Sequence, residues 1–276
     1  MEVWIKPGKE LNRQTELIMA ALTAMVMIVL ILLVQRIANP NPEIVTVADK
    51  LKPITVFPDF ASIQDIQLKK QQFFDYIEAY IVAENDRVSA LRKELASYRD
   101  VVDSSIALSP QERERVLSLA SKYRVESNQS EEKLIVDELL LKVDVIPISL
   151  VLAQAANESA WGTSRFALEG NNIFGQWCYV EGCGIVPRRR PSGASHEVKR
   201  FDSIDHAVEA SFLNINSHPV YSYLREIRAQ LRRQQEALNP MVLAYGLGRY
   251  SERGEHYVDE VQTIIEQNNL RQRDTH

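Results

Sequence analysis

Apolar residues recur at helical spacing through most of the chain after residue 62. Over residues 62–104 they follow the period of one long amphipathic helix or of two in succession. Further helices are predicted to start near residues 110 and 131 and to span about 202–215, 223–234, 240–245 and 255–268. The long 62–104 stripe is expected to pack on the rest of the chain, and docking of a protein partner is the alternative. The pattern predicts a protein dominated by α-helix.

One further helix carries a carboxylic acid on its apolar face. Pro147 suits its first turn, and Gly162 suits the position just past its end. Between them Val151, Ala155 and Glu158 fall at i, i+4 and i+7, so the Glu158 carboxyl continues the apolar stripe. Burial and the negative end of the helix dipole would both raise its pKa, which suits a general acid. A solvated residue of the last turn is the alternative.

Helical periodicity is lost between residues 176 and 201. Glycines and prolines are frequent there, and the segment ends in the alternating residues 196–201, which predicts a small β-lobe. The chain's two cysteines, Cys178 and Cys183, lie in this segment. In an oxidising compartment such a pair closes a small loop, so we favour a disulfide over two free thiols.

The N-terminal part predicts a membrane anchor. Residues 17–34 form an apolar run without a charge, just long enough to cross a bilayer as a helix. Lys6, Lys9 and Arg13 precede the run and only Arg36 follows it closely, which places the N-terminus in the cytoplasm. We therefore expect a single-pass protein of the inner membrane whose remaining chain faces the periplasm.

Charge and composition exclude several classes of protein. The formal net charge of −5 argues against a nucleic-acid binder that neutralises phosphates. We find no glycine-rich phosphate loop, and the cysteines have no nearby histidine or cysteine partners for a structural zinc site. No metal and no organic cofactor is expected.

Two motifs resemble those of a known enzyme family. AQAANESAWGTSRFA at residues 153–167 and NNIFG at 171–175 closely resemble the signature of the family 73 glycoside hydrolases, the bacterial N-acetylglucosaminidases that cut peptidoglycan. The chain looks most like the Bax-type glucosaminidases of that family. The resemblance covers roughly residues 130–270. It implies Glu158 as the catalytic acid, peptidoglycan glycan strands as the substrate, and a lysozyme-like, predominantly helical α+β fold.

The second catalytic group is less clear from the resemblance. Many relatives carry a second acidic residue in the β-lobe hairpin, but arginines stand between Pro187 and Gly193 here. Glu197, on the strand that leads to Phe201, is the best substitute, and an outward-facing strand residue is its alternative interpretation. Without a second carboxylate, the N-acetyl oxygen of the substrate can assist the reaction.

Aromatic residues complete the predicted site. The family places a tyrosine of its C-terminal helical part in the cleft, and Tyr250 matches that position best. The side chains expected to bind the sugars are Trp161, Phe174, Trp177 and Tyr257. An ordinary place in the core is the alternative for Trp161 and for Tyr250.

The predictions combine into one layout and one function. In chain order we expect a cytoplasmic N-terminus (1–16), a membrane helix (17–34), a proline-containing linker (35–61), a helical region (62–128), the glucosaminidase domain (129–270) and a tail (271–276). The expected activity is cleavage of β-1,4 bonds after N-acetylglucosamine in peptidoglycan. A lytic transglycosylase that cuts after N-acetylmuramic acid, and a non-catalytic peptidoglycan-binding scaffold, are the alternatives.

Overall fold

The structure is a computed structural model of the chain. It describes residues 16–19, 21, 25, 27, 57–127, 131–191, 193–249 and 254–274. The chain divides into two compact units, residues 1–44 and residues 45–276. The helices and the sheet described below belong to the second unit.

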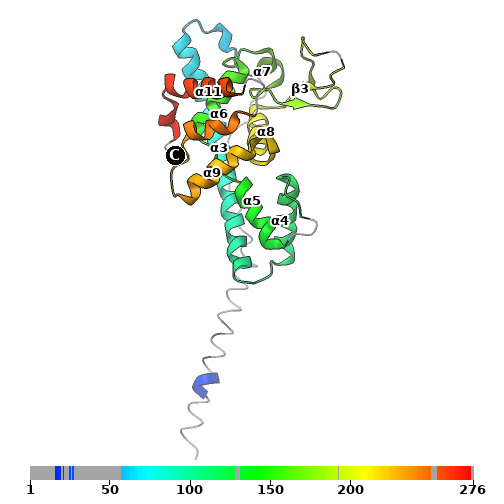
Figure 1. Ribbon diagram of the computed structural model, residues 1–276, viewed down its shortest axis with the longest axis vertical. Coiled ribbons are helices and arrows are strands. Elements are labelled where there is room, and N and C mark those ends of the chain that lie inside the picture. The colour runs from blue at the N-terminus through cyan, green and yellow to red at the C-terminus, as the bar shows by residue number, and fades with distance from the viewer. Residues whose placement is uncertain are drawn as a thin grey trace, which may run out of the picture. The chain divides into compact units, whose positions relative to one another are not determined.

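Helices make up most of the second unit (Figure 1). They are α3 (Ile66–Asp103), α4 (Pro110–Lys122), α5 (Glu132–Lys142), α6 (Ile148–Ser159), α7 (Arg165–Gly170), α8 (Ile204–Ser217), α9 (Ser222–Arg233), α10 (Pro240–Ala244) and α11 (Glu255–Gln267). Short 3-10 segments are η1 (Phe60–Ser62), η2 (Pro219–Tyr221), η3 (Tyr245–Leu247) and η4 (Leu270–Asp274). The sequence pattern correctly predicts this helical character.

The long apolar stripe forms one helix, α3, of 38 residues. Its fully buried side chains include Phe73, Ile77, Ile81 and Leu95, which belong to the same hydrophobic core as the later helices. α3 packs against α5, α6 and α8 and runs beside α5 through the unit (Figure 1). Because burial of apolar surface is the main favourable term in folding, this packing stabilises the helices that carry the site.

A buried polar cluster joins three helices near the start of α6. Asp144 accepts hydrogen bonds from Arg232 on α9 at 2.9 and 3.1 Å, and Arg92 on α3 lies 3.7 Å away. The fully buried Arg228 donates to the carbonyls of Lys142 at 2.8 Å and Asp144 at 3.1 Å. Burial alone would raise the pKa of Asp144, but the arginines outweigh it and hold that pKa below its usual value.

The predicted β-lobe between residues 176 and 201 is a three-stranded antiparallel sheet. Its strands are β1 (Trp177–Cys178), β2 (Gly184–Ile185) and β3 (Glu197–Lys199), in the order β1-β3-β2. Val198 pairs with Trp177 on one side and with Ile185 on the other. A Cβ on Gly184 would lie 2.0 Å from the Val198 carbonyl oxygen, so only glycine allows β2 to approach β3 here.

The predicted membrane helix is corrected by the structure. Of residues 17–34 the structure describes 17–19, 21, 25 and 27, and the others lie outside the described residues, as do residues 35–56 of the predicted linker. A span needs about 20 consecutive apolar residues in one helix. Among the described residues no helix is both long enough and apolar enough. α3 has the length, but charged residues interrupt it throughout.

This correction extends to every prediction that rested on the apolar run. The fold class is a mostly helical unit with a small sheet, without the expected transmembrane helix. The expected inner-membrane location and the expected contact with that membrane depended on the same helix, and both are withdrawn.

Candidate active site

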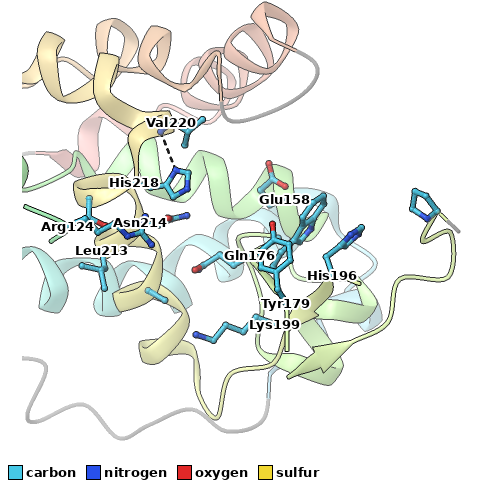
Figure 2. A pocket seen from close by; sticks show the side chains of 15 residues that line it. Arg124, Glu158, Gln176, Tyr179, His196, Lys199, Leu213, Asn214, His218 and Val220 are labelled. Atoms are coloured by element: carbon cyan, nitrogen blue, oxygen red, sulfur yellow. Dashed lines mark hydrogen bonds between the residues drawn. The ribbon is translucent and has the colours of Figure 1, made fainter. Parts of the chain in front are cut away.

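A cleft of about 1040 Å³ opens between the β-lobe, the second half of α8 and the end of α6 (Figure 2). The β-lobe side includes Gln176, Trp177, Tyr179, Pro191, His196 and Lys199. The α8 side includes Leu213, Asn214, Ser217, His218 and Val220, and Arg124 and Glu158 come from elsewhere in the chain. Among the described residues that line this cleft, Glu158 is the one carboxylic acid.

Glu158 stands next to the end of α6, and most of that helix is buried. All residues from Ile148 to Ala156 are buried, whereas the Glu158 side chain is only partly buried and reaches the cleft. Figure 2 shows its carboxyl group on the same side of the cleft as Tyr179 and His196. The helix predicted from the Pro147 and Gly162 signals is therefore present, and it brings Glu158 to this cleft.

The turn after Glu158 is fixed by a buried hydroxyl. Residues 160–162 all have positive φ, at 51, 58 and 74°, so α6 ends at Ser159, earlier than Gly162 suggests. Ser159 Oγ donates to the Ala155 carbonyl at 2.6 Å and accepts from the Gly162 N–H at 2.8 Å. A Cβ on Gly162 would lie 2.6 Å from the Phe57 ring. Within the motif around Glu158, Ser159 and Gly162 therefore form this turn.

Trp161, predicted to stack on a sugar, lies against α3 instead. Its ring meets those of Phe74 and Phe73 edge-on, with centroids 5.2 and 6.2 Å apart. The ammonium of Lys70 lies 4.7 Å from the centroid of the same ring. Trp161 is not among the residues that line the cleft, so its contacts are those of the core.

Two other predicted sugar-binding aromatics are buried as well. Phe174 is 4% exposed and belongs to the hydrophobic core. Tyr257, on α11, is fully buried, and its hydroxyl accepts a hydrogen bond from the Gln154 amide at 3.4 Å. Neither lines the cleft. Tyr250 lies outside the described residues.

Trp177 does line the cleft, together with aromatic neighbours that the sequence patterns did not indicate. The Trp177 side chain is 54% exposed, and the His196 ring stacks on it with centroids 4.0 Å apart and an angle of 12° between the planes. Tyr179 is 70% exposed on the same wall. Exposed flat rings of this kind are the surfaces on which sugar rings stack.

Glu197, predicted as a second catalytic acid, holds the β-lobe loop. It is buried, and its two oxygens accept hydrogen bonds from the backbone N–H groups of Gly182 at 3.1 Å and Gly184 at 2.8 Å. These two bonds lower the pKa of Glu197. Glu197 is also not among the cleft-lining residues. Its carboxylate therefore holds the backbone of the loop through these two hydrogen bonds.

The predicted disulfide between Cys178 and Cys183 is present. It closes the loop from β1 to β2 that carries Tyr179. Both sulfurs and the Glu197 carboxylate lie within 4.8 Å of one another. Because the sulfurs are bonded to each other, they are not the thiolates that bind metals, and this cluster is not a metal centre.

The cleft also has lining residues that the sequence motifs did not predict. Arg124, Asn214, Ser217 and His218 line its α8 side. They come from the end of α4 and from the last turn of α8, so no single stretch of sequence contains them. The spacing of Asn214, Ser217 and His218 suits one face of a helix end, but nothing in the sequence indicates that Arg124 joins them. Arg124 lies close to Lys122, which makes an ion pair with Glu209 of α8 at 3.1 Å.

Comparison with known proteins places the chain in a family. The glucosaminidase family pattern, described as mannosyl-glycoprotein endo-beta-N-acetylglucosaminidase, matches residues 133–270. The chain belongs to the glucosaminidase family. This glucosaminidase is 33% identical over 200 residues to protein Bax of Escherichia coli, a match that covers 72% of this chain and 70% of that protein. As a member of the family it is a glycoside hydrolase.

A solved structure is also similar to this glucosaminidase. It is the catalytic domain of the autolysin Auto from Listeria monocytogenes, with 20% sequence identity and a TM-score of 0.36. The similarity covers 65% of this chain and 97% of that domain. The family match itself contains the cleft from Glu158 to Val220, whereas Arg124 precedes it.

Proposed function

We propose that this glucosaminidase is a peptidoglycan hydrolase of glycoside hydrolase family 73 that cleaves β-1,4 bonds after N-acetylglucosamine. One observation carries the proposal. Among the described residues, the single carboxylic acid that lines the cleft is Glu158, and it faces a space bordered by the exposed rings of Trp177 and Tyr179. An acid beside a sugar-stacking wall is the arrangement that glycosidic cleavage requires.

In this proposal Glu158 is the general acid that protonates the leaving glycosidic oxygen. Glu158 precedes the last residue of α6 and is partly covered, so its carboxyl is held at the wall of the cleft. The hydrogen bonds of Ser159 fix the backbone turn directly after it and so hold Glu158 at the cleft.

The substrate's own N-acetyl oxygen is proposed to assist at the anomeric carbon. Both oxygens of Glu197 are engaged by backbone N–H groups, and its side chain is absent from the cleft lining. This leaves no described second carboxylate in the cleft, which favours the substrate-assisted route over a two-carboxylate one. Tyr250, which lies outside the described residues, keeps its predicted role of orienting the N-acetyl group or water.

Digestion of purified peptidoglycan tests the proposal. The wild-type chain should release fragments with new N-acetylglucosamine reducing ends, identified by mass spectrometry. The Glu158→Gln variant, which cannot donate the proton, should lose activity by about a hundredfold or more. Glu236→Gln removes a carboxyl from an exposed site just beyond α9 and should keep full activity.

Other outcomes would redirect the proposal. Anhydro-muramyl ends would show a lytic transglycosylase that cuts after N-acetylmuramic acid. Retained binding of peptidoglycan without any product, from wild type and variants alike, would show a scaffold. Equal losses in Glu158→Gln and Glu236→Gln would remove Glu158 from the chemistry.

A further inference from the structure

The α8 side of the cleft is lined by hydrogen-bond donors. Figure 2 shows Arg124, Asn214 and His218 there, separated along the cleft from Glu158 and Tyr179. Ser217 belongs to the same wall. No described residue on this side of the lining carries a carboxylate.

Arg124 occupies a backbone position that normally belongs to glycine. Its φ is 56°, in the left-handed region. It follows the end of α4, where the Val125 N–H donates to the Ala120 carbonyl at 2.8 Å, the closing bond of a helix-terminating turn. Lys142 donates to the Arg124 carbonyl at 2.5 Å and holds this conformation. A side chain kept at such a position, despite the strain, is a candidate for function.

The side chains of Arg124 and Ser217 on this wall make no hydrogen bond to other residues that the structure describes. The Arg124 side chain is exposed, and its guanidinium has no hydrogen bond or ion pair to any residue that the structure describes. Ser217 is 2% exposed, and its buried Oγ has no hydrogen-bond partner among the described residues. A buried hydroxyl without a hydrogen-bond partner destabilises the fold unless a ligand or a water molecule supplies the partner.

His218 adds a third donor. Its Nδ1 accepts the Val220 N–H at 3.2 Å, so the neutral ring carries its proton on Nε2. Burial first, and then the positive charges of Arg124 and Arg225, lower the pKa of His218 and keep the ring neutral. The same two arginines make this end of the cleft electropositive.

The end of α8 does not cancel this positive potential. Carbonyl groups at a helix C-terminus repel anions. Here the buried Arg225 donates to two of them, the carbonyls of Ile215 at 2.8 Å and His218 at 3.0 Å. The carbonyl charge is thereby compensated from inside the protein, while Arg124 faces the cleft.

We propose that Arg124, Asn214, Ser217 and His218 form a subsite that binds a carboxylate of the substrate. The guanidinium of an arginine is positively charged and can donate two parallel N–H bonds to a carboxylate. Sugar hydroxyls are neutral and do not require a charged partner. The inference rests on the proposed function, because in peptidoglycan the N-acetylated sugars are neutral and the negative charge lies on the peptide, or on the lactyl group where the peptide has been removed. The subsite therefore selects glycan strands that carry these groups.

The test uses Arg124→Gly in the full chain. Glycine suits the positive φ at this position, so the variant should fold at least as well as wild type. Its kcat/KM is compared on native peptidoglycan and on peptidoglycan whose carboxylates have been amidated. The ratio of the two values should fall about tenfold relative to wild type, the size expected for a charge-assisted hydrogen bond. Arg233→Ala, which removes an exposed arginine of α9, should leave the ratio unchanged.

A third substrate identifies which carboxylate is bound. Amidase-treated strands lack the peptide and carry a free lactyl carboxylate, which the intact strand holds in an amide bond to the peptide. If Arg124→Gly lowers kcat/KM on these strands as well, the subsite also accepts the lactyl carboxylate, and if the effect is confined to strands that carry the peptide, a peptide carboxylate is the ligand. An unchanged ratio of native to amidated activity in Arg124→Gly would overturn the subsite, as would the same change in Arg233→Ala.

Binding separates this inference from the proposed function. If wild type releases no product from peptidoglycan, the proposed function fails. The affinities of a soluble disaccharide-peptide fragment and its amidated form are then measured by calorimetry for wild type and Arg124→Gly. A weaker preference for the charged fragment in the variant supports the subsite on its own, and equal preferences overturn it.

Discussion

Glu158 and Glu197 differ in what surrounds their carboxyl groups. Glu158 is partly buried and lines the cleft, whereas the oxygens of Glu197 accept hydrogen bonds from the backbone N–H groups of Gly182 and Gly184 at 3.1 and 2.8 Å. These bonds stabilise the charged form of Glu197 and lower its pKa, so it is ionised where a general acid must be protonated. At the scale of single residues, the two glutamates therefore have different tasks, and Glu197 acts as a support.

The Glu197→Gln variant tests whether Glu197 only holds the β-lobe loop or also takes part in the reaction. The amide keeps one acceptor oxygen but places its NH₂ against one of the two backbone N–H groups, so the loop should loosen. We expect a partial loss of peptidoglycan cleavage, much smaller than for Glu158→Gln. Hydrogen exchange should show faster exchange of the Gly182 and Gly184 amides. Complete loss of cleavage with unchanged exchange would instead place Glu197 in the reaction.

The β-lobe is an element too small to be stable through its strands alone. Its three strands have two or three residues each, and the segment between β1 and β2 presents Tyr179 to the cleft. The Cys178–Cys183 disulfide and the Glu197 hydrogen bonds tie this segment from two sides. Since isolated short strands are marginal in water, these links set the shape of the cleft wall.

Removal of the disulfide tests this role at the scale of the element. The bond joins residues five positions apart, and closing so short a loop contributes about 2 kcal/mol in the chain-entropy description. The Cys178→Ser, Cys183→Ser double variant should thus remain folded, with a lower free energy of unfolding in urea and a higher KM for glycan. An unchanged KM would show that the wall keeps its shape without the bond.

The molecule as a whole depends on contacts between the segment before the family match and the segment inside it. Phe73 and Phe74 on α3 pack on Trp161, three residues after Glu158. Arg92 on α3 reaches the Asp144 cluster, and Arg124 lines the cleft. The boundary predicted at residues 128 and 129 stays a prediction, but the core runs across it without a break.

The charge of Asp144 makes the stability of the fold depend on pH. Its folded-state pKa is lowered below the unfolded value, so its contribution to stability is present above the unfolded pKa and is lost as the pH falls through the folded pKa. Asp144→Asn should lower the free energy of unfolding at neutral pH by about 3 kcal/mol, because it leaves arginines facing an uncharged group.

Urea unfolding of both proteins over a pH series checks this expectation. The difference between wild type and Asp144→Asn should shrink once the pH drops below about 4, where this aspartate begins to bind a proton in the unfolded chain. A difference that is constant over the whole series would show that the charge of Asp144 contributes nothing and that only its hydrogen bonds matter.

Local patterns predicted the helices, the β-lobe, the disulfide and the place of Glu158 at a cleft. Each depends on neighbours in sequence: apolar periodicity for α3 and α6, glycine and proline for the lobe, and a short separation for the cysteines. The prediction of a membrane helix at residues 17–34 was wrong: among the residues that the structure describes, no helix is long and apolar enough to cross a membrane.

Long-range packing decided whether each of these side chains faces the cleft or the core. Trp161, Phe174 and Tyr257 are aromatic residues near the motifs, and the sequence alone does not distinguish a ring that faces sugar from one that faces the core. Arg124 and His218 lie far apart in sequence and join one wall of the cleft only through the tertiary fold. Periodicity assigns a residue to a face of its own helix, whereas the partner of that face is set by the burial of the whole chain.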